Sequence, residues 1–262
     1  IRVSLTEDAW NEIDPCKRLI ALAKSYENAP GESFEEKNRH IEAIKKRSVI
    51  LPKTISLHRD GTVIVGVNQN DVTSPDFYKK IGCDTELGRP KLKISSSDCI
   101  VLKEESHQTE ISKTLKKLKE TGITTFSLDS SANTLSILSL QDLSAMHKNQ
   151  SNKDRFSISP SIKSESTVIV ENEPEESWSI IETVQPSLIF LSPKTNKLHY
   201  SRQFFDWLQT RNITIPVILS FSYDCTKEDL VIQAAAEYGA LFCDGLGDGI
   251  WIQAPYEIEF LR

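Results

Sequence analysis

Two aspartates and three glycines alternate near the C-terminal end of the sequence, in the stretch Asp244-Gly-Leu-Gly-Asp-Gly249. Glycines let backbone N–H groups approach an anion closely, and the last loops of an α/β barrel often bind phosphate in this way. Two carboxylates repel phosphate unless a cation lies nearby, and no Lys or Arg occurs between residues 228 and 261. We therefore prefer the interpretation of a tight structural turn, and we retain as candidate ligand residues Asp244, Gly245, Gly247 and Asp248.

A carboxylate cluster is the alternative chemistry for this region. Asp224, Asp244 and Asp248 each follow a predicted strand, so the three side chains could meet at one mouth of a barrel. Such a cluster could bind Mg²⁺ or act as acid and base. Lys194 follows another predicted strand and could hold an anion or form a Schiff base, but we interpret it as an exposed loop lysine. We assign no catalytic residue.

The cysteines predict no metal or cofactor site in this chain. The five cysteines lie at least 16 positions apart, no C-x-x-C motif occurs, and the five histidines are scattered as well. Clustered Cys or His residues are the usual sign of a zinc or iron–sulfur site. We interpret the thiols as reduced, small apolar groups. They are Cys16, Cys83, Cys99, Cys225 and Cys243.

Composition indicates an ordinary globular protein. The 262 residues carry a formal net charge of −6, with 39% hydrophobic and 26% charged residues. A net negative charge argues against nucleic acid or a membrane surface as partner, and no apolar run is long enough to predict a transmembrane helix. We expect a cytoplasmic protein, or a stromal one if the source has plastids.

From residue 98 onward, short continuous apolar runs alternate with amphipathic helices. Continuous apolar strands are buried on both faces, as in a parallel sheet wrapped by helices. A closed barrel explains this pattern without free edges; an open doubly wound sheet is the alternative, although no G-x-G-x-x-G follows the first strand. The predicted strands are 100–102, 124–128, 135–140, 167–170, 188–191, 215–219, 240–243 and 250–252, and the predicted helices are 106–121, 175–184, 201–211 and 226–238.

The first part of the chain is less regular. Asp14-Pro15 predicts a helix start, and a second helix should begin near Ser33. Asp60-Gly61 lies between two alternating runs, 54–58 and 62–67, which predicts a hairpin. Residues 68–97, apart from a short helix near 75–81, and residues 147–166 are predicted to be loops. The fold class is thus α/β, a TIM-barrel-like (β/α)₈ with room for degenerate repeats and an extra N-terminal hairpin. We expect a single barrel-like domain over 1–262, with N-terminal helices in 1–53 and the barrel body in 54–262.

The two ends of the chain resemble one family. Ile1-Arg-Val-Ser-Leu-Thr-Glu-Asp8 is similar to the segment that follows the last strand of the catalytic barrel in (E)-4-hydroxy-3-methylbut-2-enyl diphosphate synthases. Asp244-Gly-Leu-Gly-Asp-Gly-Ile250 is similar to the end of the extra domain in the three-domain form of that family. We therefore interpret both ends as cuts through a larger protein, and the chain as its central insert.

The resemblance implies an activity for the whole protein. That protein would reductively open 2-C-methyl-D-erythritol 2,4-cyclodiphosphate, a step of non-mevalonate isoprenoid biosynthesis, with electrons from ferredoxin or flavodoxin through a [4Fe–4S] cluster. In the family, basic residues of the first barrel hold the substrate, and three Cys and a Glu of the last module hold the cluster. Neither part lies in this chain, so no catalytic residue of the family is carried onto it.

The role of the insert itself is predicted from a similarity between two segments of its own sequence. Residues 1–8 resemble residues 250–257, which suggests that the insert is a degenerate copy of the catalytic barrel. We expect it to position the iron–sulfur module over that barrel, so its partners are those two parts of the same chain. The alternatives are a ligand- or metal-binding barrel with its own site at 244–249, and a docking surface for the electron donor at the basic stretch 79–93. A net-acidic domain should repel an acidic donor, which disfavours the last.

Overall fold

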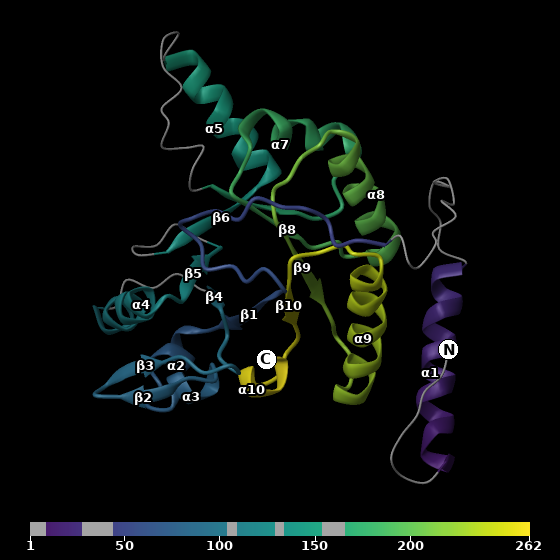
Figure 1. The fold of residues 1–262 in the computed structure, drawn as a ribbon, viewed down its shortest axis with the longest axis horizontal. Coiled ribbons are helices and arrows are strands. Elements are labelled where there is room, and N and C mark those ends of the chain that lie inside the picture. Colours follow the sequence, from purple (N-terminus) through teal and green to yellow (C-terminus); the bar gives the residue numbers. More distant parts are fainter. Residues whose placement is uncertain (1–8, 28–43, 104–108, 129–133, 154–165) are drawn as a thin grey trace.

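Among the described residues, eight parallel strands form a closed barrel (Figure 1). The computed structural model describes residues 9–27, 44–103, 109–128, 134–153 and 166–262, so the motif at 1–8 and most of the predicted second helix lie outside it. The barrel confirms the predicted TIM-barrel-like fold and excludes the open sheet. Its strands are β1 (Thr62–Val67), β4 (Cys99–Leu102), β5 (Thr124–Ser127), β6 (Leu135–Ser139), β7 (Thr167–Val170), β8 (Leu188–Leu191), β9 (Val217–Ser222) and β10 (Gly249–Gln253).

Strand β1 closes the barrel, because it pairs on one side with β4 and on the other with β10. Ile64 is in register with Cys99 of β4 and with Trp251 of β10. Every residue of β4 and of β8 is buried. The strands with continuous apolar sequences are thus buried on both faces of a parallel sheet, as predicted.

The interior of the barrel is a packed core. Phe126 and Phe190 meet edge to face at 5.2 Å, and Phe190 meets Trp251 in the same way at 5.9 Å. Ile55, which precedes β1, is buried in the same cluster. As in other barrels of this architecture, side chains fill the centre and leave no channel.

Helices cover the outside of the barrel (Figure 1). Trp178, Phe204 and Leu208 belong to the largest outer cluster, which lies between the helices and strands of the second half. Only residues 128–134 join β5 to β6, fewer than the dozen or so that a crossover helix requires, so the repeat is irregular there. The helices are α2 (Gln69–Val72), α3 (Phe77–Lys80), α4 (Thr109–Thr121), α5 (Leu140–Lys153), η3 (Glu175–Trp178), α7 (Ser179–Val184), α8 (Lys197–Thr210), α9 (Lys227–Cys243) and α10 (Ile258–Leu261).

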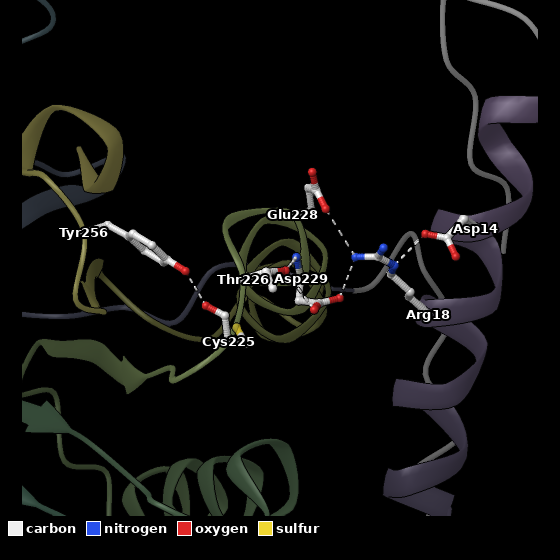
Figure 2. Close-up of polar contacts among 7 residues, drawn as sticks. All are labelled: Asp14, Arg18, Cys225, Thr226, Glu228, Asp229 and Tyr256. Carbon is white, nitrogen blue, oxygen red and sulfur yellow. Dashed lines mark hydrogen bonds and ion pairs between the residues drawn. The ribbon is translucent and has the colours of Figure 1, made fainter.

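Helix α1 (Ile13–Glu27), preceded by η1 (Ala9–Glu12), lies beside α9 and is held there by polar contacts (Figures 1 and 2). Figure 2 shows the Arg18 guanidinium between Asp14 of its own helix, at 2.7 Å, and Asp229 of α9, at 2.9 Å. No residue of α1 is fully buried. Apolar packing alone therefore does not explain how this helix stays on the barrel.

A buried charged group gives α1 a second anchor. The Glu237 carboxylate of α9 accepts hydrogen bonds from the Tyr26 hydroxyl of α1, from the Tyr223 hydroxyl at 2.7 Å and from the Lys197 ammonium at 3.2 Å. Burial, followed by the hydrogen bond to Glu237, raises the pKa of Tyr26 above its usual value. Burial lowers the pKa of Lys197, with Glu237 opposing that shift. This network was not predicted from the sequence.

The predicted strand at 240–243 is wrong, because α9 continues through these residues to Cys243. Buried Leu230, Ala234, Tyr238 and Leu241 follow one another at helical spacing, so the apolar run extends the inner face of the helix. Gly239 does not end the helix as predicted. The consequence is that the glycine turn joins a helix to a strand, and not two strands.

The predicted N-terminal hairpin is also wrong. Residues 54–58 form no strand, since both edges of β1 are already occupied by β4 and β10. A hairpin occurs instead within the predicted loop, where β2 (Asp84–Glu86) pairs with β3 (Arg89–Lys91) around Leu87 and Gly88, both at positive φ. This backbone is typical of a two-residue hairpin turn.

Two further predictions differ from the structure. Helix α5 extends to Lys153 and takes up the start of the predicted loop at 147–166. Residues 44–50, placed in a second helix or just after it, form none and run instead along the amino end of the barrel, where the Arg47 amide donates to the Gly245 carbonyl and the Ile50 amide to the Thr214 carbonyl. The domain boundary at 53/54 stays a prediction.

Candidate functional site

The glycine turn lies at the amino end of the barrel. It connects the end of α9 to the start of β10, whereas Asp224 follows β9 at the carboxyl end. In parallel barrels these two ends are opposite faces, and active sites lie at the carboxyl end. The predicted meeting of Asp224 with Asp244 and Asp248 is therefore wrong. The error follows from assigning residues 240–243 to a strand.

Asp248 is buried and its carboxylate serves the backbone. Oδ2 accepts from the Val217 amide at 2.9 Å and from Arg47 Nη2 at 3.1 Å. The main chain of the same residue pairs with Val217 on one side and Thr62 on the other. Asp248 thus joins the starts of β9, β10 and β1. Its second oxygen, Oδ1, is buried with no hydrogen-bond partner among the described residues.

Arg47 is the cation that offsets Asp248. Its guanidinium also donates to the carbonyl oxygens of Ile213, at 3.1 Å, and Ile215, at 2.6 Å. The side chain is only 6% exposed, and burial lowers the pKa of Arg47, with Asp248 opposing that shift. The pair is a buried, hydrogen-bonded connection between residues 201 positions apart. It is therefore a structural link of the kind that is costly to break on one side.

Asp244 has its own arginine. Its carboxylate lies 2.9 Å from Nε of Arg202 on α8, and both side chains are partly buried. The cations that the sequence lacks between 228 and 261 are thus supplied by Arg47 and Arg202. Nothing in the sequence signals either pairing, because the partners lie far apart along the chain.

Close packing explains two of the glycines. A Cβ on Gly245 would lie 2.5 Å from the carbonyl oxygen of Lys45, and a Cβ on Gly247 would lie 2.9 Å from Leu219. Both residues have positive φ, 74° and 94°, which side chains disfavour. The glycines are accounted for by the approach of neighbouring residues, without a bound anion.

A pocket of about 560 Å³ lies beside the turn. Its lining is mostly backbone and apolar side chains, with Lys46 and Asp60 as charged members. The exposed Phe242 and Cys243 form part of it. The candidate residues that line it are Gly245 and Gly247, whereas Asp244 and Asp248 point their carboxylates to the arginines.

The side chains that the structure describes do not fit an iron–sulfur cluster or another metal centre. Within the described part of the chain, no three His, Cys, Asp or Glu side chains are grouped so that they could hold a metal ion. Cluster ligands are thiolates, and burial raises the pKa of the Cys83, Cys99 and Cys225 thiols. Cofactor binding elsewhere in a larger protein stays a prediction.

At the carboxyl end, polar side chains follow several strands. Lys194 pairs with Glu171 at 2.8 Å, so the predicted loop lysine is exposed and engaged in an ion pair. Gln253 Nε2 donates to the Ser220 hydroxyl at 2.8 Å. Lys103, directly after β4, has no ionic partner among the described residues. It was not predicted as a site residue, although a lysine that follows a strand was a usable signal.

The basic stretch 79–93 contains the hairpin β2–β3, and its cations are largely paired. Lys91 lies 2.7 Å from Glu86, and Arg89 lies 3.6 Å from Glu120. Lys93 pairs with Asp84. This pairing weakens the idea of a basic docking surface. Among the described helices, none is long and apolar enough to cross a membrane.

Comparison with known proteins gives whole-chain matches. No family model matches the chain. It is 44% identical over 264 residues to the 4-hydroxy-3-methylbut-2-en-1-yl diphosphate synthase (flavodoxin) of Protochlamydia amoebophila, covering all of this chain and 40% of that protein. It is 30% identical over 297 residues to the chloroplastic ferredoxin form of Oryza sativa, covering all of this chain and 38% of that protein.

The similarity of this chain to a solved structure is weak. A GH30 endoxylanase from Clostridium papyrosolvens shares 10% identity over 82% of this chain and 70% of its own, with a TM-score of 0.38, too low to support an inference. The chain spans about two fifths of the length of the curated relatives it matches. Along its whole length, therefore, the chain resembles a segment of the 4-hydroxy-3-methylbut-2-en-1-yl diphosphate synthases, as its two ends predicted.

Proposed function

We propose that this chain is a non-catalytic barrel domain of a 4-hydroxy-3-methylbut-2-en-1-yl diphosphate synthase. Within that enzyme it positions the iron–sulfur module over the catalytic barrel. The whole enzyme, as the resemblance implies, reductively opens 2-C-methyl-D-erythritol 2,4-cyclodiphosphate with electrons from ferredoxin or flavodoxin through a [4Fe–4S] cluster. The whole-chain similarity to relatives named for flavodoxin and for ferredoxin supports this assignment.

One observation carries the non-catalytic part of the proposal. Both carboxylates of the glycine turn are engaged by arginines, and the turn lies at the end of the barrel opposite to the usual active-site face. The barrel interior is filled by aromatic side chains as well. Groups that are already paired and buried are poorly placed to act on a substrate, which favours a structural role.

Helix α1 supports a contact with other parts of the same enzyme. Ile13 and Ile20 of α1 are exposed, as is Trp10 of the preceding η1, whose side chain is 81% exposed. Apolar side chains grouped on one exposed face are typical of a surface that another protein part covers. The proposed partners are the catalytic barrel and the iron–sulfur module.

The test uses the full-length enzyme with and without this barrel. If the barrel positions the module, replacing it with a flexible linker should lower kcat at least a hundredfold, because misplaced reacting groups lose rate steeply. Cluster absorbance and the Kd for the cyclic diphosphate should stay unchanged. Unchanged kcat would refute a positioning role, and a weakened Kd would show that the barrel contributes to substrate binding.

The pocket beside the glycine turn favours a second candidate function, in which the barrel binds a ligand. Its volume of about 560 Å³ is in the range of small-molecule sites. Calorimetry with the cyclic diphosphate, with and without Mg²⁺, tests it on this chain. Micromolar binding lost in Lys46→Met, which changes a side chain that lines the pocket, would favour this candidate over the spacer if the fold stays intact.

A further inference from the structure

We propose that the carboxyl end of the barrel binds a small oxyanion between the ammonium group of Lys103 and the indole N–H of Trp251. The chemical class is a phosphate or a carboxylate, whose negatively charged oxygens would accept from both groups. This goes beyond the proposed spacer role and does not depend on it.

Gly66 of β1 brings the two donors together. A Cβ at this position would lie 3.2 Å from Trp251 Nε1 and 3.3 Å from Lys103 Nζ. The Lys103 chain folds over the glycine, so that its Cε would collide with such a Cβ. Both nitrogens therefore lie close to the same point beside Gly66, and the stem of Lys103 fills the place that a side chain on this glycine would take.

Neither donor has an acceptor among the described residues. Trp251 is 1% exposed, and its Nε1 is a buried nitrogen without a hydrogen-bond partner. An indole nitrogen and an ammonium group can only donate, so they cannot satisfy one another. Burying an unpaired donor destabilises the fold, and an acceptor between the two groups would remove that cost.

Trp178 is a buried tryptophan of the same fold whose indole N–H does have a hydrogen-bond partner. It is equally buried, and its Nε1 donates to the Tyr200 hydroxyl at 3.2 Å. Trp251 therefore differs from Trp178 in its partner and not in its burial. That difference points to a bound ligand as the missing acceptor for Trp251.

The strands next to β1 place further polar groups on the same side of the carboxyl end of the barrel. The barrel order places β4, β1, β10 and β9 side by side, and Trp251 is in register with Ser220 of β9. Ser220 accepts from Gln253 Nε2, which leaves its hydroxyl hydrogen to donate elsewhere. Glu171, the acidic group after β7, is held by Lys194. Asp224, which follows β9, is a further acidic group at this end, so the preference for an anion comes from the donors Lys103, Trp251 and Ser220 alone.

The experiment is an indole N–H titration of the ¹⁵N-labelled 262-residue chain by NMR. Its four tryptophans give four indole signals, and Trp251→Phe assigns the one of interest. Inorganic phosphate and acetate are added in separate arms at constant ionic strength. We expect the Trp251 signal alone to move, saturating at about 1–10 mM, as for a site with a few hydrogen bonds. The arm that saturates first tells phosphate from carboxylate.

Matched variants make the result decisive. Lys103→Met should weaken binding about tenfold or more, because a charged donor is lost while the stem remains. Lys194→Met removes the same charge from the same mouth but should leave binding unchanged, since that lysine is paired. Circular dichroism checks that each variant folds. No shift at Trp251, a shift shared with Trp178, or one unaffected by Lys103→Met would overturn the proposal, with the spacer role untouched.

Discussion

The two ends of the barrel differ in whether their candidate site groups have partners within the chain. At the amino end, Asp244 and Asp248 are each paired with an arginine, and the main chain around them is hydrogen-bonded to two strands. At the carboxyl end, Lys103 and Trp251 bring two donor nitrogens close to Gly66 without an acceptor among the described residues. The first arrangement is complete within the chain, whereas the second is open to a ligand.

The difference teaches that an acidic, glycine-rich turn is a poor indicator of function without its tertiary neighbours. The turn looked like the chemical centre of the sequence, yet its groups are used to join the ends of three strands. Substitutions at the amino end should therefore reduce stability, whereas substitutions at the carboxyl end should leave it nearly unchanged.

The largest effect is expected for Asp248→Ala. Removing this carboxylate leaves Arg47 buried without its counter-charge, and breaking one side of such a pair costs about 3 kcal/mol or more. Urea unfolding followed by circular dichroism measures the loss.

Asp244→Ala is the matched control for Asp248→Ala. Its partner Arg202 is 26% exposed, so solvent can take over the lost interaction and the cost should be roughly 1 kcal/mol or less. Equal losses in the two variants would contradict the view that burial makes the Arg47 pair special.

Next in size is Gly245→Ala, which tests close packing in the turn. The new methyl group would meet the backbone of Lys45 and also strain a residue at φ 74°. We expect a loss of about 2 kcal/mol in the free energy of unfolding. Gly88→Ala is the control, because Gly88 has φ 71° and nothing within 4 Å of its would-be Cβ. A loss in Gly88→Ala as large as that in Gly245→Ala would mean that backbone strain alone explains the glycine.

A smaller effect is expected for Tyr26→Phe, which removes a hydrogen bond to the buried Glu237. The loss should be about 1–2 kcal/mol near neutral pH, as for a bond to a charged group. Tyr256→Phe, whose hydroxyl donates to the neutral Cys225 carbonyl as Figure 2 shows, should cost less.

The pH dependence of the Tyr26 contribution has a definite sign. The pKa of Tyr26 is raised above its usual 10.0 in the folded state, so its contribution is complete below pH 10 and is lost as the pH rises further. The gap in unfolding free energy between wild type and Tyr26→Phe should therefore narrow above pH 10. The lowered pKa of Lys197 acts with the opposite sign but is present in both proteins. A gap that widens above pH 10 would contradict this assignment.

The smallest effect is expected for Lys103→Met. Since the ammonium group has no ionic partner among the described residues, its loss should change the unfolding free energy by about 0.5 kcal/mol at most. Thermal unfolding is the measurement. A loss comparable to that of Asp248→Ala would show that the carboxyl end is also a structural junction, and the contrast between the two ends would disappear.

The sequence predicted most of the barrel because its signals are local. Continuous apolar runs gave seven of the eight strands, and Thr226 with Asp229 marked the start of α9, where the Thr226 hydroxyl accepts from the Asp229 amide. Residues 240–243 were wrongly predicted as a strand because four apolar residues fit a buried strand and a helix face equally well. The Asp60-Gly61 turn misled because hairpin pairing depends on whether a strand edge is free, which is a property of the whole sheet.

The sequence by itself determined the fold class, the segments that alternate around the barrel and the family that its ends resemble. Only the tertiary structure decided what the glycine turn does, because Arg47 and Arg202 reach it from distant positions and because an α9 that continues to Cys243 places it at the amino end. The spacing of apolar residues along the sequence shows which residues face a core. An ion pair between residues 201 positions apart produces no such pattern, so it can be identified only once the folded strands bring the two side chains together.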